Sequence, residues 1–190
     1  GGLSGGLPGL SLAAGSSQAM GVRPYQEDFR HILDPASMPA LHGMSHVLLG
    51  AAVYDGHGGK RVSQWLASQY LLLNKAMEAA QAHLQGGGTA DGLVEPLDEV
   101  FSVCGAQAIA GRFTAGSCVA VALVVHWQGV PYAVGANVGD SRTILVSWDD
   151  DASRPEGTAL SIDHKLGPPK MSEETRRVLA AGGTVLQLFG

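Results

Sequence analysis

Cysteine is scarce in this chain: Cys104 and Cys118 are its two cysteines, and they lack the spacing of a metal site or a disulfide framework. No stretch approaches the roughly 20 apolar residues of a membrane span, and the amino end carries no basic segment followed by an apolar one. The 12 basic residues are scattered and outnumbered by 17 acidic ones, which excludes the basic surface typical of nucleic-acid binding. We therefore expect a protein of a reducing compartment, the cytoplasm or the nucleus, with no nucleic-acid partner and no membrane span. Its oligomeric state is not predicted.

The chain does contain enough apolar sequence for a folded domain. With 190 residues and a hydrophobic content of 45%, it is long enough to bury one sizeable core. Residues 1–10 are rich in glycine, a composition typical of a flexible linker. We predict a linker over residues 1–10 and a single domain over residues 11–190.

Apolar patterning places the predicted strands and helices in separate groups along the chain. Strands are predicted at Leu12–Met20, Phe29–Leu33, Ser45–Val53, Ser117–His126, Pro131–Val138, Thr143–Trp148, Leu160–Ile162 and Thr184–Phe189. Helices are predicted at Lys60–His83, at Leu93–Ile109 and after the capping residue Ser172. The three strands between Ser117 and Trp148 form a predicted antiparallel meander. Segregated runs of this kind favour an α+β protein over alternating βαβ units.

The most distinctive short motif is Asp55-Gly56-His57-Gly58-Gly59, between a predicted strand and a predicted helix. We expect Asp55 and His57 to lie on the turn that joins the two elements, where functional groups are often displayed. Glycines allow positive φ angles and close approach of a ligand to the backbone, so the Gly56 carbonyl can bind an ion beside the Asp55 carboxylate. Taken alone, the motif is equally well explained by a glycine-rich turn with a capping Asp and a surface His.

Further motifs accompany D-G-H-G-G in a definite order. They are R-x-x-x-E-D at 23–28, G-S-C-V-A-V-A-L-V at 116–124, N-V-G-D-S-R at 137–142, and L-S-I-D-H-K at 160–165 with E-E-T-R-R-V-L-A-A-G-G-T-V at 173–185. Together these motifs resemble the protein phosphatase 2C family, the metal-dependent protein serine/threonine phosphatases. The resemblance covers most of the chain, from about Ser16 to Val185. It implies a central antiparallel β-sandwich flanked by α-helices, with two Mg²⁺ or Mn²⁺ ions in a cleft at one end of the sheets.

The resemblance assigns the acidic residues to metal binding. It implies that Asp55 bridges the two ions and that Glu27 and the Gly56 carbonyl hold one of them, while Asp28 orients metal-bound water. Asp140 matches a carboxylate that some members of the family use for a third, weaker ion. These assignments agree with the chemistry of the residues, because hard divalent cations prefer carboxylate and carbonyl oxygens.

The remaining assignments concern the phosphate. Hydrolysis of a phosphate monoester needs a nucleophilic water, neutralisation of the phosphoryl charge and a proton for the leaving alkoxide. Arg23 matches the family arginine that clamps the phosphate, and its planar fork can contact two oxygens at once. His57 matches the family general acid, a role suited to imidazole, which exchanges protons near neutral pH. Arg23, His57 and Asp55 are therefore the predicted catalytic residues.

The chain departs from the family pattern in two respects. Cys118 stands where the family more often has Thr, and we assign it no catalytic role. The family also continues past A-G-G-x-V and supplies two more metal-ligating aspartates there, so we expect these residues to be incomplete at the carboxyl end and to have little activity alone. Two functions remain open: a phosphatase acting on phosphorylated protein substrates through a metal-activated water, or an inactive pseudophosphatase that serves as a protein-binding module.

Overall fold

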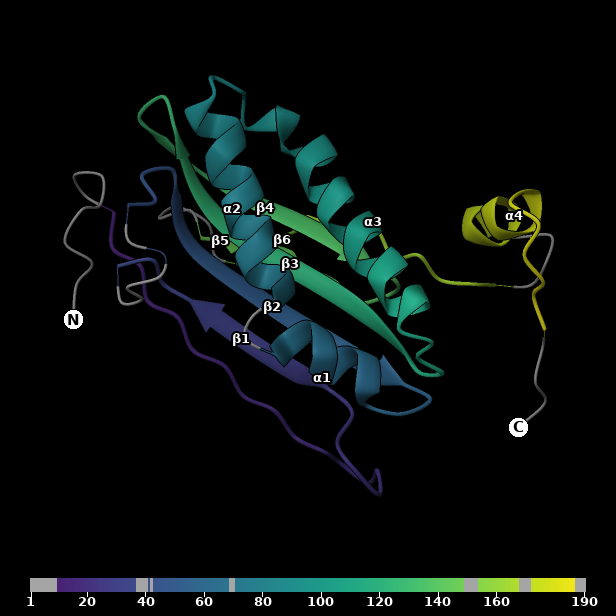
Figure 1. Cartoon of the computed structure of the whole chain (residues 1–190). Helices are drawn as coiled ribbons and strands as arrows, with labels where there is room; N and C mark the ends of the chain where they lie inside the picture. Colours follow the sequence, from purple (N-terminus) through teal and green to yellow (C-terminus); the bar gives the residue numbers. More distant parts are fainter. Residues whose placement is uncertain are drawn as a thin grey trace.

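The centre of the fold is a four-stranded antiparallel sheet in the order β1-β2-β3-β4, seen in a computed structural model that describes residues 10–36, 41, 43–68, 71–148, 154–167 and 172–186. Its strands are β1 (Phe29–Leu33), β2 (Val47–His57), β3 (Gly116–Trp127) and β4 (Val130–Val138). One face of the sheet is covered by α1 (Arg61–Ala67), α2 (Leu71–Gln85) and α3 (Val94–Ala110), the last preceded by the short 3₁₀ helix η3 (Asp91–Leu93) (Figure 1). The α+β architecture is confirmed.

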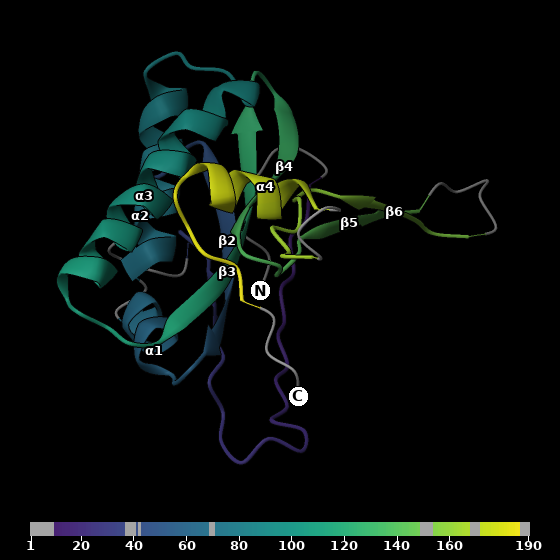
Figure 2. The same cartoon turned by 90° about the vertical axis from the view of Figure 1, so that its right-hand side faces the viewer.

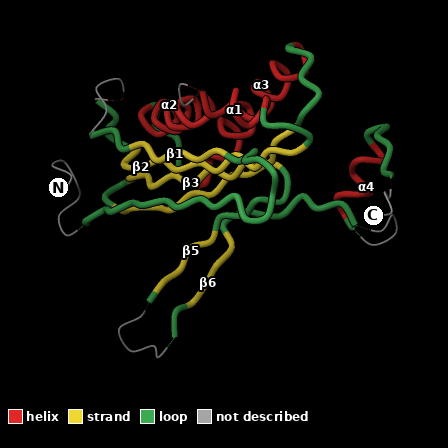
Figure 3. The backbone as a smooth tube through the Cα atoms, turned by 90° about the horizontal axis from the view of Figure 1, so that it is seen from below, coloured by secondary structure: helices red, strands yellow, loops and turns green. Residues whose placement is uncertain are grey.

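Two smaller parts of the chain lie away from the helices. The strands β5 (Ile144–Ser147) and β6 (Glu156–Ala159) pair with each other and project from the opposite side of the sheet (Figures 2 and 3). Helix α4 (Glu173–Ala180) follows an extended connection and lies beside the sheet rather than on it. The predicted β-sandwich stays a prediction, since β5 and β6 are all that the described residues contribute to a second sheet.

Alternation along β2 gives the sheet its buried and its open face. Gly50, Ala52 and Tyr54 are buried under the helices, whereas Val53 and Asp55 are exposed on the other face. The apolar residues that form the core on the helix side include Val119, Val121, Leu123, Val125, Leu72, Leu73 and Met77. This core fixes the register of β2, because a shift by one residue would turn its apolar side chains outward. It therefore also fixes the face on which Asp55 lies.

Asp55 and His57 lie inside β2 and not on the turn that the sequence predicted. Their neighbour strand β3 begins at Gly116, which pairs with His57, while Cys118 pairs with Asp55. Backbone pairing with β3 therefore extends strand β2 as far as His57. The turn itself starts one residue later, where Gly58 and Gly59 adopt the positive φ angles 66° and 119°. The two functional side chains are thus held by a sheet.

The predicted helix Lys60–His83 is wrong in its continuity. Helix α1 ends at Ala67, and the next residue, Ser68, has an extended backbone with φ −62° and ψ 132°. The Ser68 backbone N–H donates to the Gln64 and Trp65 carbonyls, and the Ser68 hydroxyl also donates to the Trp65 carbonyl at 2.7 Å, so these oxygens at the helix end have partners. The break lets α1 pack beside the end of β2 while α2 follows the length of the sheet (Figure 1).

Three predicted strands also need correction. The segment Leu12–Met20 forms no strand but is held to β1 by side chains, since Arg30 Nε donates to Ser16 Oγ at 2.9 Å. The segment Thr143–Trp148 contains β5, which pairs with β6 instead of continuing the meander after β4. Leu160–Ile162 is a bend after β6. Strand pairing depends on the partners that a segment finds in the fold, which apolar patterning alone does not specify.

The other predicted elements that lie wholly within the described residues are confirmed. Phe29–Leu33, Ser117–His126 and Pro131–Val138 correspond to β1, β3 and β4, and Leu93–Ile109 corresponds to α3. Ser172 caps α4, since its side chain accepts from the Thr175 N–H. The predicted linker 1–10 lies almost wholly outside the described residues, and so does half of the predicted strand Thr184–Phe189, whose described residues 184–186 form no strand. Within the described ranges, no helix has both the length and the apolarity needed to cross a bilayer.

Candidate functional site

Charged groups from several elements meet around Asp55, near the end of β2. Burial of the Asp55 carboxyl raises its pKa, and the negative charges of Asp28 and Asp140 raise it further. The charges of His57 and Arg23 act in the opposite direction. Since Coulomb effects of this kind decay with distance in water, these side chains lie within electrostatic range of Asp55. The structure thus brings together predicted site residues from the segment before β1, from β2 and from the segment after β4.

Glu27 is tied to the turn that follows β2. Its carboxylate oxygen Oε1 accepts from the Gly59 N–H at 2.6 Å, and its backbone carbonyl accepts from the buried Ser63 hydroxyl at 2.5 Å. Gly56 lies against this same carbonyl and hydroxyl, so that a side chain at position 56 would overlap them. Glycine is therefore required at position 56 for a steric reason, beside any part its carbonyl has in binding an ion.

Ser63 is a supporting residue that sequence reasoning missed, because nothing in its spacing connects helix α1 with Glu27. Ser63→Ala is expected to lower the free energy of unfolding by about 1–3 kcal/mol, the usual cost of leaving a buried polar group unsatisfied. The matched control is Ser68→Ala, which removes an exposed serine–carbonyl bond close to the same helix. We expect it to change the free energy by no more than about 0.5 kcal/mol in chemical denaturation. Equal losses in the two variants would contradict the special role of the Ser63 contact.

The His57 imidazole lies over the first residue of β3. A Cβ atom on Gly116, the cross-strand partner of His57, would overlap the His57 ring. The absence of a side chain on Gly116 therefore gives the imidazole its place on the sheet surface. His57 is exposed there, so its ring is accessible to a molecule that approaches the open face.

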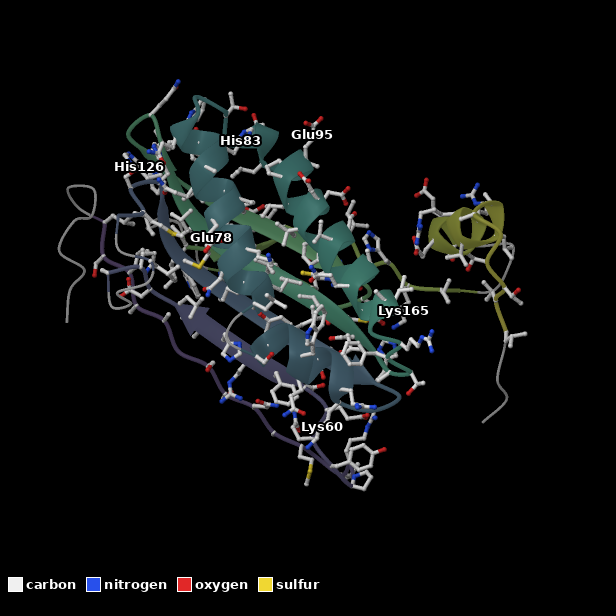
Figure 4. All side chains as sticks on the ribbon, in the orientation of Figure 1. Lys60, Glu78, His83, Glu95, His126 and Lys165 are labelled. Carbon is white, nitrogen blue, oxygen red and sulfur yellow. The ribbon has the colours of Figure 1, made fainter. Side chains whose placement is uncertain are left out.

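Asp140 lies on the turn after β4, where two groups contact it. The Cys118 thiol donates to Asp140 Oδ1 at 3.4 Å, and Lys165 Nζ lies 3.7 Å from Oδ2. In Figure 4, Lys60 and Lys165 lie toward the end of the sheet where β2 ends, and His126 lies toward the opposite end. The site therefore occupies one end of the sheet.

A second loop supports the Asp140 turn. Arg142 donates from Nε and Nη2 to the two Asp163 carboxylate oxygens at 2.9 and 2.6 Å. These hydrogen bonds hold the pKa of Asp163 below its usual value. The His164 N–H donates to the Gly139 carbonyl at 2.8 Å, so the two loops are joined by backbone as well. The spacing of the motif I-D-H-K in the sequence does not show that Asp163 pairs with Arg142.

The donor set is compatible with hard divalent cations. Asp55, Asp28 and Asp140 offer carboxylate oxygens, and a cation among them would relieve the repulsion that raises the Asp55 pKa. Among the described residues, no three His, Cys, Asp or Glu side chains are grouped closely enough to enclose an ion. Mg²⁺ commonly binds through one or two carboxylates and keeps several waters, so this arrangement fits it. The individual ligand assignments stay predictions.

The fold is an α+β fold in which helices cover one face of an antiparallel sheet. At one end of the sheet, acidic residues lie near an arginine and a histidine. A protein of this class is suited to metal-assisted phosphate chemistry. A profile of the protein phosphatase 2C family matches residues 13–190. Because this match covers nearly the whole chain, the chain belongs to the protein phosphatase 2C family.

Individual relatives agree with this membership. The chain is 36% identical to "Probable protein phosphatase 2C 8" of Oryza sativa subsp. japonica, in an alignment that covers 73% of this chain and 35% of the relative. It is 34% identical to "Probable protein phosphatase 2C T23F11.1" of Caenorhabditis elegans, over 70% of this chain and 33% of the relative. It is 30% identical to "Protein phosphatase 2C 56" of Arabidopsis thaliana, over 93% of this chain and 40% of the relative. The alignments thus span well under half the length of these relatives.

Proposed function

We propose that the protein is a metal-dependent phosphatase that hydrolyses phosphoserine and phosphothreonine in proteins. The observation that carries the proposal is that the charges of Asp28, Asp140, His57 and Arg23 act on Asp55, whose cross-strand partner Cys118 contacts Asp140. The family membership supports it, since the relatives carry the name protein phosphatase. When bound, Mg²⁺ or Mn²⁺ would supply a nucleophilic water at neutral pH and neutralise phosphoryl charge.

The acidic residues of this chain would bind the metal ions and orient water. Asp55, Glu27 and the Gly56 carbonyl would hold two ions, Asp28 would orient water, and Asp140 would hold a weaker third ion. These groups are oxygen donors, as such ions require.

Arg23 and His57 would act on the phosphate ester, one by its positive charge and the other as a proton donor. Arg23 is exposed, and its positive charge acts on Asp55. Both properties are needed in a residue that binds the phosphate of an incoming protein substrate. His57 would donate a proton to the leaving serine or threonine oxygen. Its position over Gly116 leaves the ring open to the substrate.

The second candidate function is a pseudophosphatase that binds phosphorylated proteins without hydrolysing them. One observation favours it: the described residues contain no cluster of three metal-ligating side chains. In this reading Arg23 and the open end of the sheet retain phosphate binding, and the carboxylates hold too little metal for turnover.

Phosphate release from a phosphothreonine peptide separates the two candidates. It is measured with the longest form of the protein that carries these 190 residues, first with Mn²⁺ and then after EDTA. We expect hydrolysis with Mn²⁺, its loss in EDTA and its return with excess Mn²⁺. Undiminished turnover in EDTA would contradict the metal mechanism. Peptide binding without turnover, removed by Arg23→Ala, would instead favour the pseudophosphatase.

A further inference from the structure

Cys118 lies between two of the carboxylates of the proposed site. It is the cross-strand partner of Asp55 in β3, and partners in an antiparallel pair carry their side chains on the same face. On its other side its thiol reaches Asp140, which follows β4. Strand β2, strand β3 and the turn after β4 therefore present Asp55, Cys118 and Asp140, in that order, at one end of the open face.

The turn that carries Asp140 is seated directly on the Cys118 side chain. Gly139, the residue before Asp140, has a φ angle of 84° and lies so close that a Cβ atom would overlap the Cys118 sulfur. The thiol then donates to Asp140 Oδ1 at 3.4 Å. The Cys118 side chain thus contacts the backbone of Gly139 and donates a hydrogen bond to Asp140. Its size and its S–H donor therefore determine where the Asp140 carboxylate lies.

The ion pair between Asp140 and Lys165 holds the Asp140 carboxylate less firmly than the Cys118 thiol does. Lys165 Nζ lies 3.7 Å from Oδ2, and the side chains of Lys165 and Asp140 are 73% and 41% exposed. Exposed ion pairs at such distances contribute little, because water screens them and a long side chain must be ordered to form them. The half-buried thiol, in contrast, is fixed by a strand in the centre of the sheet. It is also a neutral donor, so it leaves the full negative charge of Asp140 available to a cation.

We propose that Cys118 is a positioning residue: its thiol holds Asp140 beside Asp55 and thereby sets the affinity of the protein for the ion that Asp140 would bind. The inference deepens the proposed metal-dependent function and rests on it. It concerns a residue that sequence reasoning left without a role. Residues that hold a metal ligand by a hydrogen bond commonly change metal affinity about 10–100-fold when mutated, and a thiol, as a weak donor, belongs at the lower end of that range.

Mn²⁺ binding, measured by the electron paramagnetic resonance signal of the free ion, tests the proposal without relying on turnover. The variants are Cys118→Ala, which removes the donor, Cys118→Ser, which keeps one, and Asp140→Asn, together with the double variant Cys118→Ala/Asp140→Asn. Cys104→Ala is the matched control, since Cys104 is a buried thiol in the helix layer. Thermal unfolding of each variant confirms that it is folded.

We expect Cys118→Ala to weaken one class of bound Mn²⁺ about tenfold and Cys118→Ser to retain most of that affinity. In the Asp140→Asn background, Cys118→Ala should have no further effect, because the group it positions is already gone. Cys104→Ala should bind like the unmodified protein. Unchanged binding in Cys118→Ala, or an equal loss with and without Asp140, would overturn the positioning role alone. A protein that binds no Mn²⁺ before any substitution would overturn the metal-dependent function, and the positioning role with it.

Discussion

Asp55→Asn is expected to lower phosphopeptide hydrolysis about 10³-fold, since metal ions supply several kcal/mol of transition-state stabilisation and each 1.36 kcal/mol is tenfold in rate. Asp55 is the proposed bridging ligand, and an amide oxygen carries no charge to bind two cations. The loss is measured as kcat with saturating Mn²⁺, in the longest form of the protein that carries this chain. A variant that keeps turnover within about tenfold of the unmodified enzyme would show that Asp55 bridges no ions.

The same substitution should stabilise the metal-free protein at neutral pH. Burial and the charges of Asp28 and Asp140 raise the Asp55 pKa in the folded state, so the ionised carboxylate opposes folding at pH 7. As the pH falls through the folded-state pKa, Asp55 takes up a proton and the penalty disappears. The gain in Tm from Asp55→Asn should therefore be present at pH 7 and shrink toward acid pH.

Asp163 provides a control of the opposite sign. Its pKa is lowered by the hydrogen bonds from Arg142, so its ionised form favours folding above the unfolded-state pKa, and this contribution is lost as the pH falls. Asp163→Asn should thus fail to raise Tm at pH 7. A parallel rise in both variants would indicate a general effect of removing negative charge and would contradict the local explanation for Asp55.

His57→Gln is expected to slow hydrolysis of a phosphoserine peptide by roughly 10²–10⁴-fold, the usual contribution of general acid catalysis. The loss should be much smaller with p-nitrophenyl phosphate. A serine alkoxide is strongly basic and needs a proton to leave, whereas p-nitrophenolate leaves without one. Single-turnover measurements at saturating Mn²⁺ are required, because slow product release could hide the difference.

His164→Gln is the matched control for His57. His164 is also exposed and lies on the loop next to Asp140, but its recorded contact with the Gly139 carbonyl is made by the backbone N–H. Its substitution should leave both substrates nearly unaffected. Equal losses on the two substrates in His57→Gln would assign His57 to positioning of water or to support of the strand end, and would remove it as the proton donor.

Both candidate functions make the open face of the sheet the place where substrate or partner arrives. The helices α1, α2 and α3 lie on the other face (Figure 3). Gly56 and Ser63 are buried. The difference between the functions lies in metal affinity, which the carboxylates around Asp55 control. Measurements of Mn²⁺ binding and of turnover in the same preparations therefore decide between them.

Much of the local structure was predictable because it depends on neighbours in sequence. Apolar patterning and turn residues identified β1, β3 and β4, and the Ser172 cap identified α4. The break after α1 was not predictable from the same signals. The residues on both sides of Ser68 have helical spacing, and the interruption serves the packing of α1 against the strand end.

Motif order and residue type need no three-dimensional information, so they were enough to identify the family and to predict which residues carry its chemistry. Only the tertiary structure decided that Asp55 and His57 lie in a strand, that Ser63 holds Glu27, and that Cys118 contacts Asp140. Each of these contacts joins segments far apart in the chain. Their formation depends on strand pairing and on a shared core, whose free energy no local pattern of residues contains.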